Sequence, residues 1–97
     1  MRTRSFVIDG LELTLERCFF AKYERLYVNG MFVDKKNSSW GNLYSFKVQE
    51  GKTLIPYKVL TALLMSDTAL FRNGSRIIDK EEVPILKARL YHELELV

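Results

Sequence analysis

The chain has 97 residues, of which 47% are hydrophobic and 28% charged, and this length and composition suit one folded domain spanning residues 1–97. They exclude a second domain and a large cofactor-binding architecture. Fifteen Lys and Arg against 12 Asp and Glu give a net charge of +3, and residues 1–49 hold the whole excess, with eight basic and five acidic side chains.

Three Asx-Gly dipeptides, each between apolar-rich arms, predict three tight β-hairpins. A two-residue hairpin turn of type I′ requires positive φ at both central residues, which Asp, Asn and Gly tolerate. The predicted structural turns are Asp9-Gly10, Asn29-Gly30 and Asn73-Gly74. A fourth turn is predicted at residues 49–52, where two extended arms meet at a glycine.

The segment after the first turn alternates strictly between apolar and polar residues, as a strand with one buried face does. Leu11, Leu13 and Leu15 therefore share a face, and we expect this face to enter the core. Residues 38–42 have the composition of a loop and include the only tryptophan. We expect this residue, Trp40, to plug one end of the core.

Two segments fit both a strand and a helix. Residues 54–65 place apolar side chains at positions that suit a helical face, but the segment lies between two hairpins. A strand is favoured there because it completes the antiparallel meander, which a helix would interrupt. Residues 80–97 also offer a helical stripe, yet strict alternation from 86 to 96 explains more positions. We predict a final strand at 87–96, with a C-terminal helix as the alternative.

These elements predict an all-β fold, either an antiparallel β-sandwich or a meander of about seven to eight strands. The hairpin order resembles small β-sandwich domains of the Fas apoptosis inhibitory molecule type, on the strength of residues 26–34, 44–46, 51–55 and 69–77. This resemblance covers residues 5–78, and it implies an interaction or stability module without catalysis. Arg72 departs from the pattern, which has an apolar strand residue there.

The predicted C-terminal strand would lie at a sheet edge, where unpaired backbone groups promote association. In an antiparallel pair of two copies centred near Tyr91, Arg89 would lie opposite Glu93. We therefore predict a homodimer whose interface includes Arg89, Tyr91 and Glu93. Insertion of the segment as a closing strand of the sandwich is the alternative.

The residues that usually carry catalysis or hold a cofactor are scarce. Cys18 and His92 are the only cysteine and histidine, and a structural zinc site needs about four ligands. No glycines have the spacing of a phosphate-binding loop. We expect no catalytic residue, no metal and no cofactor, and therefore do not expect an enzyme.

The single cysteine favours a reducing cytoplasm, because small secreted domains usually carry several disulfides. The longest uncharged apolar run, residues 59–65, is far shorter than the roughly 20 residues of a membrane span. We expect neither a membrane span nor a secretion signal.

The leading hypothesis is a non-enzymatic protein-interaction or structural β-domain that binds an unknown protein partner or a second copy of itself. The alternative is a nucleic-acid-binding module that uses the basic N-terminal half. Its polyanion contacts would be Arg2, Arg4, Arg17, Lys22, Arg25, Lys35 and Lys36. Residues 29–36 weakly suggest an RNA-recognition strand, but a hairpin arm that buries Met31 or Phe32 explains them better.

Overall fold

The computed structural model describes residues 2–38, 40–78 and 80–83. These residues form nine strands and one turn of 3₁₀-helix, which confirms the all-β prediction. In chain order the elements are β1 (Arg2–Ile8), β2 (Leu11–Cys18), β3 (Tyr23–Val28), β4 (Met31–Lys36), β5 (Leu43–Glu50), β6 (Thr53–Leu60), η1 (Met65–Asp67), β7 (Ala69–Arg72), β8 (Ser75–Ile77) and β9 (Lys80–Val83).

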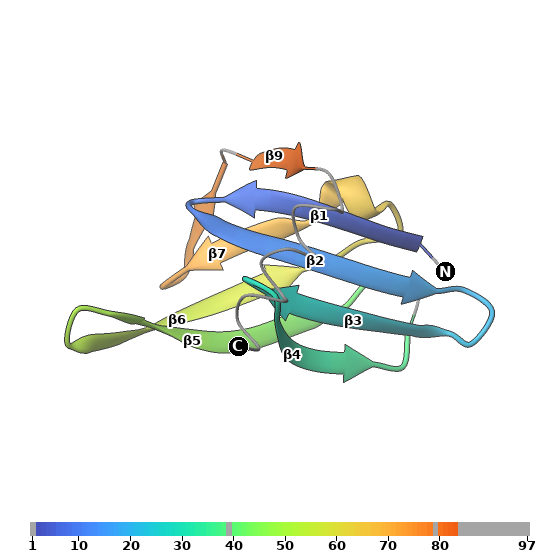
Figure 1. Ribbon diagram of the computed structural model, residues 1–97, viewed down its shortest axis with the longest axis horizontal. Helices are drawn as coiled ribbons and strands as arrows, with labels where there is room; N and C mark the ends of the chain where they lie inside the picture. Colours follow the sequence, from blue (N-terminus) through green and yellow to red (C-terminus); the bar gives the residue numbers. More distant parts are fainter. Residues whose placement is uncertain (1, 39, 79, 84–97) are drawn as a thin grey trace.

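The strands form two antiparallel sheets (Figure 1). Sheet A has the order β4-β3-β2-β1-β9, and sheet B has the order β5-β6-β7-β8. The chain passes from sheet A to sheet B between β4 and β5, and it returns at β9, which pairs with β1. The two sheets face each other, so the predicted antiparallel sandwich is confirmed.

The three Asx-Gly turns have the predicted backbone conformation. Both central residues have positive φ in each turn: Asp9 and Gly10 at 52° and 77°, Asn29 and Gly30 at 51° and 80°, and Asn73 and Gly74 at 49° and 87°. This is the type I′ pattern, whose twist matches that of paired strands. The fourth predicted turn is also present, because Glu50 pairs with Thr53 across Gly51 and Lys52.

Successive connections of an antiparallel meander alternate between the two ends of the sandwich. The four tight turns lie at one end, and three longer connections, residues 19–22, 37–42 and 61–68, lie at the other. We call this second end the loop end; it lies toward the right of Figure 1.

Both sheets contribute to the core. Sheet A supplies Leu13 and Leu15, which are fully buried as predicted, and Leu11 packs against the cluster while partly buried. The other fully packed members are Phe6, Ile8, Leu26, Tyr44, Tyr57, Val59, Met65 and Leu70. Alternate residues of each strand therefore meet between the sheets, as the period of two requires.

The strand prediction for residues 54–65 is right for its first half only. β6 ends at Leu60, and residues 61–64 form a loop that leads into η1. Leu63 and Leu64, which fitted a helical face in the sequence, are half exposed or more. The strand stops there because β7 pairs with β6 only as far as Leu60, opposite Ala69.

Three further expectations meet different outcomes. The outgoing arm of the second hairpin buries neither Met31 nor Phe32, which are 60% and 56% exposed. Strand β9 occupies residues 80–83, at the start of the segment 80–97 that also fitted a helix in the sequence. The predicted strand at 87–96, and with it Arg89, Tyr91 and Glu93, lies outside the described residues.

Candidate functional site

A buried ion pair lies beneath the loop end. Arg17 on β2 and Glu24 on β3 are direct cross-strand neighbours, and both face the interior of the sandwich. Each is fully buried, with no exposed surface. A buried charge is costly unless its partners satisfy it, so the contacts of these two side chains decide what they do.

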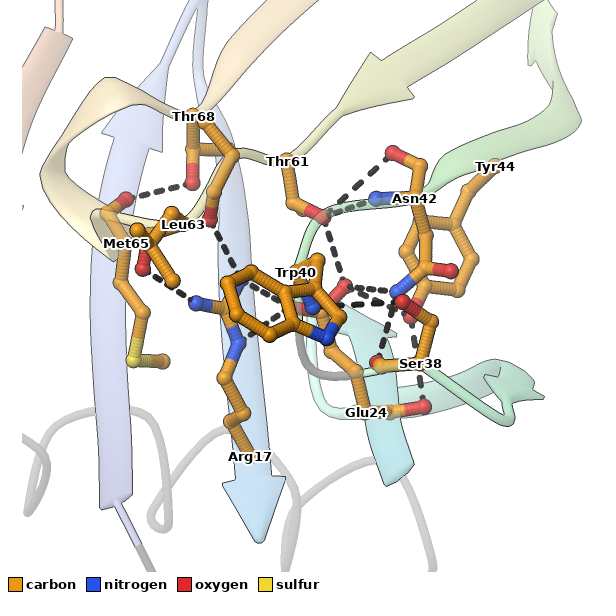
Figure 2. Close-up of polar contacts among 11 residues, drawn as sticks. Arg17, Glu24, Ser38, Trp40, Asn42, Tyr44, Thr61, Leu63, Met65 and Thr68 are labelled. Carbon is orange, nitrogen blue, oxygen red and sulfur yellow. Dashed lines mark hydrogen bonds and ion pairs between the residues drawn. The ribbon is translucent and has the colours of Figure 1, made fainter. Parts of the chain in front are cut away.

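The guanidinium of Arg17 has four hydrogen bonds (Figure 2). Its Nε and Nη2 donate to Oε2 of Glu24, the first at 2.8 Å. Its Nη1 donates to the carbonyl of Leu63, and its Nη2 donates to the carbonyl of Ala62, both at 2.7 Å. The side chain thus ties the β6–β7 connection of sheet B to β2 of sheet A.

The second carboxylate oxygen of Glu24 is also hydrogen-bonded. Its Oε1 accepts hydrogen bonds from Thr61 Oγ1 at 2.7 Å, Tyr44 OH at 3.0 Å and Asn42 Nδ2 at 3.0 Å. Burial and the adjacent Glu24 carboxylate raise the pKa of Tyr44 well above its ordinary value, so its hydroxyl stays a donor. We call Arg17, Glu24, Asn42, Tyr44 and Thr61 the buried network.

The buried network fixes the loops above it. Thr61 N donates to the Asn42 carbonyl at 2.8 Å, and Asn42 N donates to the Thr61 hydroxyl. The two loops pass so closely that a Cβ at Gly41, whose φ is 134°, would lie 2.6 Å from the carbonyl oxygen of Thr61. The ion pair is inaccessible to solvent, and the network ties the loops of sheet B to sheet A.

Five large apolar side chains are exposed on the three connections of the loop end. They are Phe19 (48% exposed), Phe20 (99%), Trp40 (74%), Leu63 (51%) and Leu64 (61%), and we call them the apolar rim. The ring of Phe19 has its centroid 5.8 Å from the guanidinium carbon of Arg17, whose Nη1 donates to the Leu63 carbonyl. Trp40 belongs to the connection that Asn42 holds through the Ser38 carbonyl. Three of the five side chains thus lie on connections that the buried network or its members contact.

The expected role of Trp40 as a core plug is wrong. Its indole is 74% exposed, so it does not close the core. Its backbone is held in place, since Trp40 N donates to Ser38 Oγ at 3.2 Å and Asn42 Nδ2 donates to the Ser38 carbonyl at 3.1 Å. The tryptophan is thus displayed from a constrained loop.

The basic residues named as polyanion contacts do not gather on one face. Arg17 is inside the protein and cannot reach a ligand outside it. Three others have carboxylate neighbours, in the pairs Arg4–Glu82, Arg25–Glu16 and Lys36–Asp34. Arg25 and Lys35 are opposite each other on β3 and β4, and each cation lies 4.8 Å from the centroid of the Tyr23 ring. Arg2 begins β1, and Lys22 is in the β2–β3 turn.

Sequence reasoning missed the buried network, although one pattern pointed to it. The inward face of β2 continues from Leu13 and Leu15 to Arg17, and the inward face of β3 runs from Leu26 back to Glu24. Opposite charges at inward positions of two neighbouring strands, each two residues from the 19–22 connection, are a recognisable sign of a buried pair.

No protein-family model, curated protein or solved structure matches the chain. Within residues 2–38, 40–78 and 80–83, no group of three His, Cys, Asp or Glu side chains could hold a metal ion. No helix in that part of the chain is long and apolar enough to cross a membrane. Cys18 is partly buried, and His92 lies outside the described residues.

Proposed function

We propose that this protein is a non-enzymatic protein-interaction domain that contacts a partner protein through the apolar rim of the loop end. The observation that carries the proposal is the exposure of five large apolar side chains at one end of the sandwich, with Phe20 almost completely exposed and with the Trp40 and Leu63 connections held by the buried network. Exposed apolar side chains that gather on one part of a domain usually mark interaction sites.

The composition of the rim suits protein binding. Trp and other aromatic residues are enriched among the residues that contribute most to protein–protein affinity. Loops that are already ordered lose little conformational freedom on binding, which improves affinity at a given contact area. The buried network supplies this order, because it holds the Trp40 loop and the Leu63 loop by hydrogen bonds to Arg17 and Asn42.

Strand addition at a sheet edge is a second mode of the same function. β8 and β9 are short, with three and four residues. The pairing of β4 with β3 shifts register between Leu26 and Tyr27 of β3, and β4 ends in Lys35 and Lys36. Short, bulged and lysine-bearing edges discourage pairing. In the described part of the chain β5 is the one long, regular edge, so strand addition would use β5.

The proposal agrees with what the resemblance to domains of the Fas apoptosis inhibitory molecule type implies, an interaction module without catalysis. The single cysteine supports a reducing compartment, and we assign the protein to the cytoplasm on that ground. Under this proposal the partner is either another protein or a second copy of the chain.

Site-specific photo-crosslinking tests the proposal. A benzophenone amino acid replaces Phe20 in one variant and Lys52 in a control variant, since Lys52 is exposed in the β5–β6 turn at the opposite end. On irradiation in the cells that make the protein, we expect one discrete adduct from position 20 and none from position 52. Excess unlabelled wild-type domain should abolish the adduct, whereas a Trp40→Ser variant with unchanged thermal stability should compete poorly.

The outcomes separate the alternatives. An adduct of twice the domain mass identifies a second copy as the partner. Equal adducts from both positions, no adduct, or full competition by Trp40→Ser would each contradict binding through the apolar rim. If only a probe on β5, for example at Lys47, gave an adduct, the partner would bind by strand addition at β5 and not through the apolar rim.

A further inference from the structure

The outer face of sheet B carries positive charge without negative charge. Its outward residues follow from the alternating burial of β5 and β6 and from the register of β7 and β8. They are Leu43, Ser45, Lys47, Gln49, Leu54, Pro56, Lys58, Leu60, Ala69, Phe71 and Arg76. This set, which we call the sheet-B face, contains three cations and no carboxylate.

The one acidic residue of these four strands points the other way. Glu50 lies on the inner side of β5, where it forms an ion pair with Arg72 and accepts a 2.6 Å hydrogen bond from Tyr57. Lys47, Lys58 and Arg76 form no ion pair with any residue in the described ranges. The inner cation of sheet B is thus neutralised, whereas the three outer cations have no carboxylate partner among residues 2–38, 40–78 and 80–83.

The register groups these charges around an aromatic ring. Lys58 pairs with Phe71, and Phe71 pairs with Arg76, so the three side chains form one row across β6, β7 and β8. With strands about 4.8 Å apart, the row is about 10 Å long. Lys47 pairs with Pro56, two residues before Lys58, and lies diagonally next to it. Phe71 is partly exposed and does not belong to the core cluster.

Charge decides what this face can bind. A dimer formed through this face would bring the cations of both copies together, and the face has no carboxylate to offset them. Self-association through this face is therefore disfavoured. An anionic occupant gains from all three cations. A lipid surface is the weaker fit, because Leu43, Leu54 and Leu60 on this face are only about half exposed, whereas Phe20 and Trp40 at the loop end are 99% and 74% exposed.

We propose that the sheet-B face binds single-stranded nucleic acid, with phosphates on Lys47, Lys58 and Arg76 and a base stacked on Phe71. Cations along a strand path combined with an aromatic platform are the usual means of single-strand recognition. A flat four-stranded face cannot enter the groove of a duplex, and only an unpaired base offers its face to Phe71. This site goes beyond the proposed protein interaction and uses a different surface.

Fluorescence anisotropy with a labelled oligouridylate measures the binding. Three cationic contacts predict that the logarithm of the association constant falls with the logarithm of salt concentration with a slope of about −2 for a single strand. The triple variant Lys47→Gln, Lys58→Gln and Arg76→Gln should lose this slope and most of the affinity. Phe71→Leu should weaken binding about tenfold through lost stacking while keeping the slope.

A matched control removes the same charge elsewhere. The triple variant Arg2→Gln, Lys22→Gln and Lys35→Gln also lowers the net charge from +3 to 0, and it should bind nearly as wild type. Loss of binding in this control instead would place the site on the N-terminal basic residues and overturn the proposal. Equal affinity for a duplex, or binding to phosphatidylserine vesicles with none to the oligouridylate, would overturn it as well.

Discussion

Removing the cation of the buried network should destabilise the domain more than any surface change. Arg17→Met keeps most of the aliphatic stem but deletes four hydrogen bonds, two to Glu24 and one each to the carbonyls of Ala62 and Leu63. It leaves a fully buried carboxylate without its counter-charge. Loss of one partner of a buried pair costs about 3–5 kcal/mol, a large part of the roughly 5–15 kcal/mol that stabilises a domain.

Urea unfolding followed by far-ultraviolet circular dichroism measures this loss. With a denaturant slope of about 2 kcal/mol per molar, the midpoint should fall by about 2 M. Arg25→Met is the matched control, because Arg25 and Glu16 are paired on the same β2–β3 ladder but at 4.0 Å and with both side chains partly exposed. Such a pair contributes at most about 1 kcal/mol, so the control midpoint should hardly move.

The double variant Arg17→Met, Glu24→Leu distinguishes a coupled pair from two independent contributions. If the pair is coupled, the double variant should cost no more than either single one, which corresponds to a coupling energy of about 3 kcal/mol. Additive losses would refute the reasoning. So would a loss below about 1 kcal/mol for Arg17→Met, since that would mean that Glu24 finds other compensation.

Three further changes test the turns and a partly exposed ion pair. Gly10→Val should cost about 1–2 kcal/mol in thermal unfolding, because φ is 77° and no atom lies near the new Cβ, so strain alone acts. Gly41→Ala should cost about 1–3 kcal/mol, because its Cβ would meet the Thr61 carbonyl at 2.6 Å. Hydrogen bonding to Arg72 lowers the pKa of Glu50, so this pair stabilises the fold above the unfolded pKa near 4.3 and its contribution is lost as pH falls through the lower folded pKa. An NMR titration should show the Glu50 pKa rise in Arg72→Gln.

The turns could be predicted from the sequence because their cause is local. Each Asx-Gly dipeptide satisfies the positive φ of its own two residues, and no distant contact is needed to select that geometry. The alternation of Leu11, Leu13 and Leu15 likewise identifies a buried face, because the period of a strand is set by its own backbone. All-β architecture followed from these two features.

The loop end could not be predicted because its contacts are between segments far apart in the chain. Whether Leu63 is in a strand or a loop depends on where β7 stops pairing with β6. The exposure of Trp40 depends on Asn42 holding its loop to Thr61 and Glu24. Composition marks Trp40 as a core residue, and only the tertiary hydrogen bonds turn it outward.

The connections at the two ends of the sandwich satisfy their backbone hydrogen-bonding groups in different ways. A tight turn satisfies its backbone groups within two residues, so the end that carries Gly10, Gly30 and Gly74 needs no buried polar side chain. The 61–68 connection is too long for that, and the carbonyls of Ala62 and Leu63 point toward the interior, where an apolar side chain would leave them without donors. Arg17 supplies those donors, and its charge in turn requires the carboxylate beneath it. The polar interior is therefore what allows this end to have long loops of defined shape, and it leaves their apolar side chains on the outside, where a partner can reach them.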